Sequence, residues 1–183
     1  MRSIGGDARG ERPRRTPGRG VRPTSARART ALFDLLAAKG VAGARVLDLY
    51  AGLGTLGIEA LRRGAKGCDF VEHNPRLCSA LEARLEASGL KGTARVLCMK
   101  TGRALELLEG PYDIVFMDPP YDMPGVDAVV ARLAMGGLVA VGGLLVVEHA
   151  KQVALEEGYG ELERWRSRRY GDTVITIYTA GEM

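Results

Sequence analysis

Ala44-Arg45-Val46-Leu47-Asp48-Leu49-Tyr50-Ala51-Gly52-Leu53-Gly54-Thr55-Leu56-Gly57 is the stretch of sequence that decides the fold. Its apolar first half predicts a buried strand, and its glycines predict a loop that turns into a helix ending near Gly64. Gly52 permits a tight turn and Gly54 lets a ligand approach the backbone, while the start of the helix presents unpaired N–H groups. The stretch therefore predicts an α/β protein with a ligand site at the end of this strand.

Asp48 distinguishes this loop from an ordinary dinucleotide site. Residues 52–57 spell Gly-Leu-Gly-Thr-Leu-Gly, which matches the GxGxxG fingerprint of dinucleotide-binding proteins. An acid four residues before the first glycine repels a pyrophosphate, but it can pair with an ammonium group. The sequence therefore favours an amino acid conjugate as the ligand, and a nicotinamide oxidoreductase is the competing interpretation.

A second acid, Glu72, ends the next expected strand, 67–72. The tip of the second strand is where an acid binds ribose hydroxyls in this kind of fold. The alternative is a charge at the entry of a helix, because Asn74 and Pro75 predict the N-cap and first turn of a helix there.

The rest of the chain alternates between helical and strand patterns and closes on a hairpin. Alternating elements of this kind predict a doubly wound, mostly parallel sheet with an antiparallel edge. The expected elements are a helix at about 25–39, a strand at 94–99, a short helix around 104–108, strands at 112–117 and 143–148, and a hairpin of 161–170 and 173–179 about a Gly171-Asp172 turn.

The fourth strand runs into the rigid loop Asp118-Pro119-Pro120-Tyr121. Each proline fixes its own φ and lacks an N–H, and Pro120 keeps Pro119 out of helical geometry, so the carbonyls face outward. A carboxylate, carbonyl oxygens and an aromatic ring then lie at the carboxyl end of a strand, where open α/β sheets bind ligands. The alternative is a turn in which Asp118 forms local hydrogen bonds and Tyr121 fills the core.

Positive charge is concentrated at the N-terminus. Residues 1–30 hold nine arginines against two acids, a balance of +7, which leaves −3 for the remainder of a chain whose total is +4. Five glycines and three prolines in the same segment predict an extended arm without a packed core. Arginine forks suit phosphates, so the arm predicts nucleic-acid binding. The alternative is a solubilising tail.

Composition places the chain among globular proteins of one domain plus an extension, with 183 residues, 46% hydrophobic and 26% charged. The most apolar run, 138–147, is too short to span a bilayer, and we expect a cytoplasmic protein. Cys68, Cys78 and Cys98 are widely spaced, which favours reduced core thiols, and no metal site is expected. No unexplained apolar stripe requires a partner, which favours a monomer.

In this order, Asp48-x-x-x-Gly52-x-Gly54, Glu72 and Asp118-Pro119-Pro120-Tyr121 resemble the class I S-adenosylmethionine-dependent methyltransferases that methylate exocyclic amines of nucleobases. More closely, the chain resembles the RsmD family, the guanine-N2 methyltransferases of 16S ribosomal RNA in the bacterial small subunit. The matching runs include Met1-Arg2, Ile4-Gly5-Gly6, Arg9-Gly10, Arg22-Pro23-Thr24-Ser25, Leu47-Asp48-Leu49-Tyr50-Ala51-Gly52 and Tyr170-Gly171-Asp172-Thr173.

The resemblance implies a Rossmann-like, seven-stranded, mostly parallel sheet with an antiparallel C-terminal hairpin strand and helices on both faces. It implies a basic arm at 1–24 that contacts RNA and a methyltransferase domain at 25–183. It further implies S-adenosylmethionine as cofactor and, as partner, 16S rRNA within the small subunit or its assembly intermediate. The implied cofactor contacts are Asp48, Tyr50, Gly52, Gly54, Glu72, Arg103 and Ala104, and the implied RNA contacts are Arg2, Arg9, Arg22 and Arg27.

An exocyclic amine is a poor nucleophile because its lone pair is delocalised into the ring. Hydrogen bonds from its N–H groups to the Asp118 carboxylate and the Pro119 carbonyl would favour a pyramidal nitrogen, and Tyr121 would stack on the base. Two further alternatives stay open: an N6-adenine DNA methyltransferase and a non-catalytic RNA-binding module. His149 follows the fifth strand and is expected to be structural.

Overall fold

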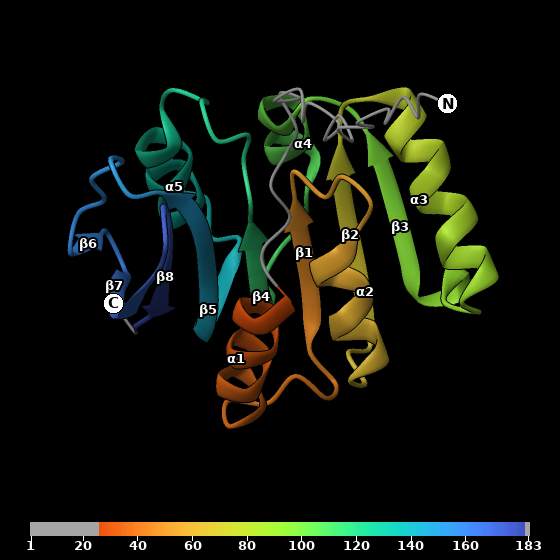
Figure 1. Cartoon of the computed structure of the whole chain (residues 1–183), viewed down its shortest axis with the longest axis horizontal. Coiled ribbons are helices and arrows are strands. Elements are labelled where there is room, and N and C mark those ends of the chain that lie inside the picture. Colours follow the sequence, from red (N-terminus) through yellow and green to blue (C-terminus); the bar gives the residue numbers. More distant parts are fainter. Residues whose placement is uncertain (1–25, 182–183) are drawn as a thin grey trace, which may run out of the picture.

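An eight-stranded sheet forms the middle of this computed structural model, which describes residues 26–181. The strand order is β3-β2-β1-β4-β5-β8-β7-β6 (Figure 1). The first five strands of the chain are parallel, and β8, β7 and β6 continue the sheet by antiparallel pairing. The strands are β1 (Arg45–Leu49), β2 (Gly67–Glu72), β3 (Ala94–Cys98), β4 (Tyr112–Met117), β5 (Val139–Ala150), β6 (Gly158–Tyr159), β7 (Leu162–Tyr170) and β8 (Thr173–Ala180).

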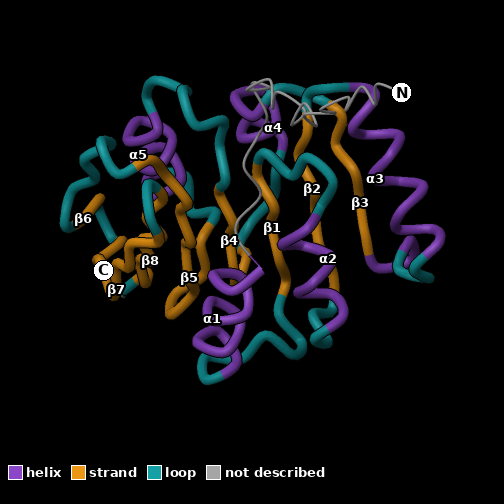
Figure 2. Tube along the Cα trace, in the orientation of Figure 1, coloured by secondary structure: helices purple, strands orange, loops and turns teal. Residues whose placement is uncertain are grey.

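Helices cover both faces of the sheet, as the sequence predicted (Figure 2). Side chains of α1, α2 and α3 form one core with alternate residues of the strands, and α4 and α5 form a second core with the intervening residues. On β1, Val46 belongs to the first core and Leu47 to the second, as the two-residue period of a strand requires. The helices are α1 (Ala26–Ala37), α2 (Thr55–Arg62), α3 (Pro75–Ala87), α4 (Thr101–Leu107) and α5 (Val126–Met135), with a short 3-10 helix η1 (Lys91–Thr93).

Local sequence signals account for most element boundaries. Asn74 caps α3 by accepting the backbone N–H of Arg76 at 3.0 Å, and Pro75 takes the first helical position. Gly171 has φ of 66° between β7 and β8, and confirms the predicted hairpin. Most other bounds differ slightly from the prediction, and two differences are larger. β5 begins at Val139 and not at 143, because the strand continues past Gly142 with a shifted register against β4, and the two-residue β6 adds an eighth strand.

The parallel strands bring the predicted acids to one edge of the sheet. Residues Asp48 on β1 and Phe116 on β4 are in register, and so are Asp48 and Phe70 on β2. Asp48, Glu72 and Asp118 therefore occupy the carboxyl ends of three adjacent strands. This edge is where a sheet of this kind binds ligands.

Within residues 26–181, no helix is long and apolar enough to cross a membrane.

Candidate active site

Asp48 lies at the end of β1 and is 2% exposed. Its Oδ2 accepts the backbone N–H of Gly57, in the first turn of α2, at 2.9 Å. Burial raises the pKa of Asp48 to about 7, the Gly57 bond opposes that rise, and the negative charge of Glu72 adds to it. A buried carboxyl with this pKa gains from a positively charged ligand, which would hold it ionised.

The glycine loop that follows β1 has an open side and a closed side. A side chain on Gly52, which has φ of 54°, would meet nothing within 4 Å. A Cβ on Gly54 would lie 2.4 Å from Leu81 Cδ1 of α3. Glycine at 54 therefore has a packing reason, because its missing side chain makes room for Leu81 of the core. Its contact with a ligand stays a prediction.

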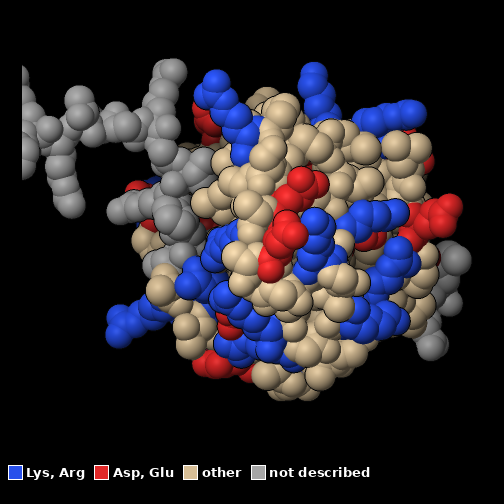
Figure 3. Space-filling view, turned by 90° about the vertical axis from the view of Figure 1, so that its right-hand side faces the viewer, with Lys and Arg blue, Asp and Glu red and all other residues tan. Residues whose placement is uncertain are grey.

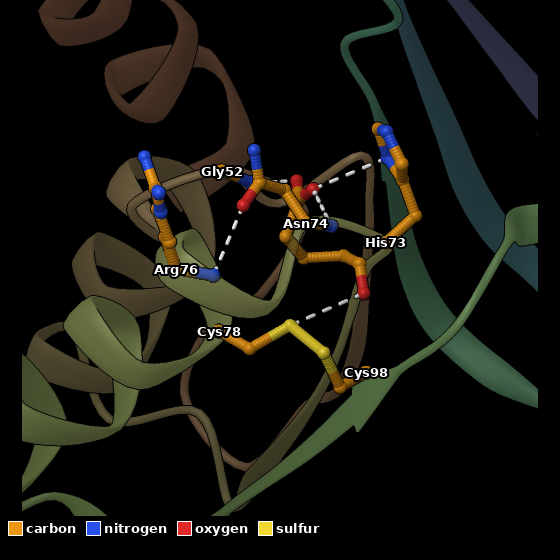
Figure 4. Close-up of a disulfide and its surroundings, with 7 residues drawn as sticks. Gly52, His73, Asn74, Arg76, Cys78 and Cys98 are labelled. Carbon is orange, nitrogen blue, oxygen red and sulfur yellow. Dashed lines mark hydrogen bonds and ion pairs between the residues drawn. A yellow bond between two sulfur atoms is a disulfide. The ribbon is translucent and has the colours of Figure 1, made fainter.

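Glu72, at the tip of β2, joins the loop between β1 and α2 to the loop between β2 and α3. Its Oε2 accepts the N–H of Gly52 at 3.0 Å, and its Oε1 accepts the N–H of Asn74 at 2.7 Å. Oε1 also lies 3.2 Å from Nδ1 of His73 (Figure 4). Each carboxylate oxygen has two lone pairs, so Oε2, which accepts a single hydrogen bond, retains acceptor capacity toward a ligand above the loop.

A disulfide lies next to the backbone of Glu72. Cys78 in α3 is bonded to Cys98 at the end of β3, with 5.9 Å between their Cα atoms (Figure 4). The prediction of reduced thiols is wrong for this pair and holds for buried Cys68, which is free. The two cysteines are 20 residues apart and meet because the first turn of α3 packs beside the end of β3. Cys78 Sγ is 3.3 Å from the Glu72 carbonyl oxygen, a packing contact because a disulfide sulfur carries no proton.

Asp118 follows β4 and is half-buried. Burial raises its pKa to about 8, and the negative charges of Glu148 and Asp48 contribute further. Glu148 is a site residue that sequence reasoning missed. It lies near the end of β5, the strand beside β4, and its position as an acid at the carboxyl end of a parallel strand was the available signal.

The rest of the Asp-Pro-Pro-Tyr loop has one engaged carbonyl and one available carbonyl. The Pro120 oxygen accepts the N–H of Met123 at 2.9 Å, so only part of the predicted set of outward carbonyls exists. No hydrogen bond reaches the Pro119 carbonyl from the described part of the chain. Tyr121 is 50% exposed and its hydroxyl donates to the Asp172 carbonyl, which excludes the core-filling alternative.

Three other predicted cofactor residues lie at or near the start of α4 and the end of β1. Tyr50 adopts φ of 61°, and burial raises its pKa while a hydrogen bond with Thr101 of α4 opposes the rise. Arg103 is exposed and pairs with Glu106 at 2.8 Å. The Ala104 side chain is fully buried in the second core. Its backbone N–H donates to the Lys100 carbonyl at 3.0 Å, and its carbonyl accepts the Leu108 N–H at 2.9 Å.

The predicted RNA contacts fall mainly outside the described residues. Arg2, Arg9 and Arg22 lie in residues 1–25, and Arg27 is exposed on α1.

His149 is buried and has a structural position. Its Nδ1 lies 3.0 Å from the Ala150 oxygen, and its Nε2 lies 2.9 Å from Oγ1 of Thr176. Among residues 26–181, no group of three or more His, Cys, Asp or Glu could hold a metal ion.

Comparison with known proteins gives consistent matches over nearly the whole chain. A family model described as "Conserved hypothetical protein 95" matches residues 1–179. "Putative rRNA methyltransferase YlbH" of Bacillus subtilis (strain 168) is 32% identical over 97% of this chain and 98% of its own length. "Ribosomal RNA small subunit methyltransferase D" of Escherichia coli (strain K12) is 35% identical over 97% of this chain and 89% of its own length. The solved structure of "Putative methyltransferase yhhF" from Escherichia coli is similar with a TM-score of 0.81, 30% identity and 90% of each chain covered.

Proposed function

The chain belongs to the RsmD-like family of ribosomal RNA methyltransferases, and we propose that it methylates the exocyclic N2 amine of a guanine in 16S rRNA of the small subunit, using S-adenosylmethionine. Its fold is the class I methyltransferase fold that the sequence predicted. The observation that carries the proposal is the position of Asp118, a half-buried carboxyl beside an available backbone carbonyl, at the sheet edge shared with Asp48 and Glu72.

The loop between β1 and α2 has the features that the cofactor requires. When bound, S-adenosylmethionine supplies a methyl group carried on a positively charged sulfur. Asp48 provides a buried negative charge for the methionine moiety, and Oε2 of Glu72 provides an acceptor for the ribose hydroxyls. The open side of Gly52 leaves room for the ligand against the backbone.

Asp118 and Pro119 orient the target amine. The ionised carboxylate of Asp118 accepts one N–H of the amine, and the Pro119 carbonyl accepts the other. These two bonds favour a pyramidal nitrogen whose lone pair points at the methyl group. The exposed ring of Tyr121 stacks on the base once the base has left its neighbours. The ionised form of Asp118 accepts the amine N–H with either carboxylate oxygen, so the raised pKa of Asp118 makes the reaction depend on pH.

The test is methyl transfer from labelled S-adenosylmethionine to three substrates: small ribosomal subunits, naked 16S rRNA and duplex DNA. Nucleoside digestion and mass spectrometry identify the product. We expect N2-methylguanosine in RNA, and no transfer by an Asp118→Asn variant that still binds the cofactor. Label found only as N6-methyladenine in DNA would overturn the choice of substrate. No transfer to any of the three, together with retained RNA binding, would favour the non-catalytic RNA-binding module.

A further inference from the structure

β7 carries a concentration of positive charge that the proposed reaction does not use. Its nine residues include four arginines and one acid, Glu163. Arg164 is held within the fold, because it pairs with Glu157 and donates to the carbonyls of Leu155 and Glu156. Arg166 and Arg168, in contrast, are exposed and form no ion pair with the described part of the chain. Two arginine forks are therefore available for an external anion.

Arg166 and Arg168 project from the same face of the sheet. They stand opposite Ile177 and Ile175 of β8, whose side chains pack in the core beneath α1. Side chains directly opposite in an antiparallel pair share a face. The two arginines accordingly line a groove of about 140 Å³ between β7 and α1, together with Tyr170, Leu32, Leu35, Ala31, Ile175 and Ile177.

The side chains of Arg166, Arg168 and Tyr170 lead toward the loop of residues 118–121. β7 is antiparallel to β8, which is antiparallel to β5, so β7 runs in the direction of β4 and ends at the same edge of the sheet. Tyr170 is its last residue, and the next turn carries Asp172, whose carbonyl accepts the Tyr121 hydroxyl. Residues on one face of a strand repeat about every 7 Å. Arg166, Arg168 and Tyr170 thus form a ladder that ends two residues before the carbonyl that Tyr121 contacts.

Another basic surface lies on the opposite side of the molecule. Figure 3 shows Lys and Arg side chains mixed with acids over α3 and β3. Arg95 pairs with Asp69 there, at 2.8 Å, and Lys91 with Glu86, at 3.4 Å. These pairs partly neutralise the charge of that face. The ladder on β7 lacks such partners and adjoins the proposed site of methyl transfer, which makes it the better surface for a polyanion.

We propose that the arginine ladder (Arg166, Arg168 and Tyr170) binds the RNA backbone next to the target guanine. Guanidinium forks bind phosphate oxygens in a bidentate manner, and the Tyr170 ring provides a stacking surface. Trp165 keeps Arg166 in place, since its ring centroid is 5.3 Å from the guanidinium carbon. This inference rests on the proposed function. It adds a second RNA-binding element, on the folded domain, to the predicted basic arm.

The test compares Arg166→Gln/Arg168→Gln with a matched control, Arg62→Gln/Lys66→Gln, which removes two exposed charges at the other end of the sheet. RNA affinity is measured by fluorescence anisotropy with 16S rRNA fragments over a range of salt, and methylation kinetics are measured on the same RNA. For the ladder variant we expect KM and Kd for RNA to rise about tenfold with unchanged kcat and cofactor affinity. The slope of log K for RNA binding against log salt concentration should become shallower by about 1.4, because two phosphate contacts are lost and each single-strand contact contributes about 0.7 to that slope.

An equal change in the control variant, or unchanged RNA affinity in the ladder variant, would overturn the inference. The single variant Arg168→Glu is the second test if the double variant shows a lower Tm, and a charge reversal should weaken RNA binding more than tenfold. Failure of the proposed function is separately visible. In that case the wild-type protein transfers no methyl group to RNA, while the anisotropy experiment still reports whether the ladder binds it.

Discussion

The carboxylate of Asp48 accepts the backbone N–H of Gly57 at 2.9 Å, so one side chain joins the end of β1 to the first turn of α2. A negative charge at this position is stabilised by the partial positive charge of a helix N-terminus. The bond uses only Oδ2, and Oδ1 remains for a ligand. Asp48 therefore has a structural part and a binding part, and these can be separated by substitution.

We predict that Asp48→Asn keeps the fold and weakens cofactor binding. An asparagine carbonyl oxygen can still accept the Gly57 N–H, but the side chain has no charge to pair with an ammonium or sulfonium group. Calorimetric titration with S-adenosylmethionine should give a Kd about 10 to 100 times higher. Asp34→Asn, which removes an exposed acid from α1, is the control and should bind as the wild type does. Equal affinity of Asp48→Asn and wild type would contradict the assigned role.

Asp118→Asn should abolish methyl transfer and raise stability at high pH. Its folded-state pKa of about 8 lies above the ordinary value of 3.8, so the folded protein favours the protonated form. The free energy of unfolding therefore falls as pH rises from about 4 to about 8, because the unfolded chain loses this proton first. Asparagine mimics the protonated carboxyl and removes that loss.

Thermal melts at pH 4 and pH 9 check this prediction. The Tm of Asp118→Asn should equal that of wild type at pH 4 and exceed it by several degrees at pH 9. Activity should fall by about a thousandfold above pH 8, where the wild-type carboxylate is ionised and orients the amine, and by a smaller factor at lower pH, where the wild-type carboxyl is protonated. Asp122→Asn, an exposed neighbour in the same loop, is the control. A variant that is less stable than wild type at pH 9 would show that the buried charge is compensated in the fold.

Much of this fold follows from local patterns. The Gly171-Asp172 turn lies between two alternating segments, and the pattern alone predicts the hairpin. The three acids of the site were predictable for a topological reason: Asp48, Glu72 and Asp118 each lie at the carboxyl end of a parallel strand, and parallel strands end at a common edge. Position along the strand was therefore enough to group them.

Features that depend on tertiary contact were not predictable. The pairing of Cys78 with Cys98 depends on how α3 packs beside β3, and the spacing of the two cysteines in the sequence does not predict it. The influence of Glu148 on the pKa of Asp118 depends on the neighbouring positions of β4 and β5. The reason for glycine at 54 also became visible only with Leu81 of α3 beside it.

Gly57→Ala should destabilise the protein, because α2 lies directly on β2 at this position. A Cβ there would be 2.3 Å from Phe70 Cε1 and 2.7 Å from Cys68 Sγ, both of them buried side chains. Overpacking of this kind costs about 1 to 3 kcal/mol. Gly92→Ala is the control, since its Cβ would meet nothing within 4 Å. Urea unfolding should give a lower midpoint for Gly57→Ala alone. Equal midpoints would mean that α2 shifts away from β2 without loss.

The bridge between Cys78 and Cys98 should stabilise the protein and support the loop at Glu72. A cross-link over 20 residues contributes about 3 kcal/mol in the chain-entropy model. Alkylation in denaturant without reductant should label one of the three cysteines, Cys68, and three after reduction. Cys98→Ser should lower the free energy of unfolding by a similar amount.

Dithiothreitol provides the matched comparison for the same bridge. It should lower the Tm of wild type to that of Cys98→Ser, and it should leave the Tm of Cys98→Ser unchanged, because this variant has no bridge to reduce. Cofactor affinity should fall in both forms that lack the bridge, wild type with dithiothreitol and Cys98→Ser. The reason is that the bridge joins α3 to the end of β3 and Cys78 Sγ lies 3.3 Å from the Glu72 carbonyl oxygen. Labelling of all three thiols before reduction, or a Tm that is insensitive to dithiothreitol in wild type, would mean that α3 and β3 are held together by packing alone.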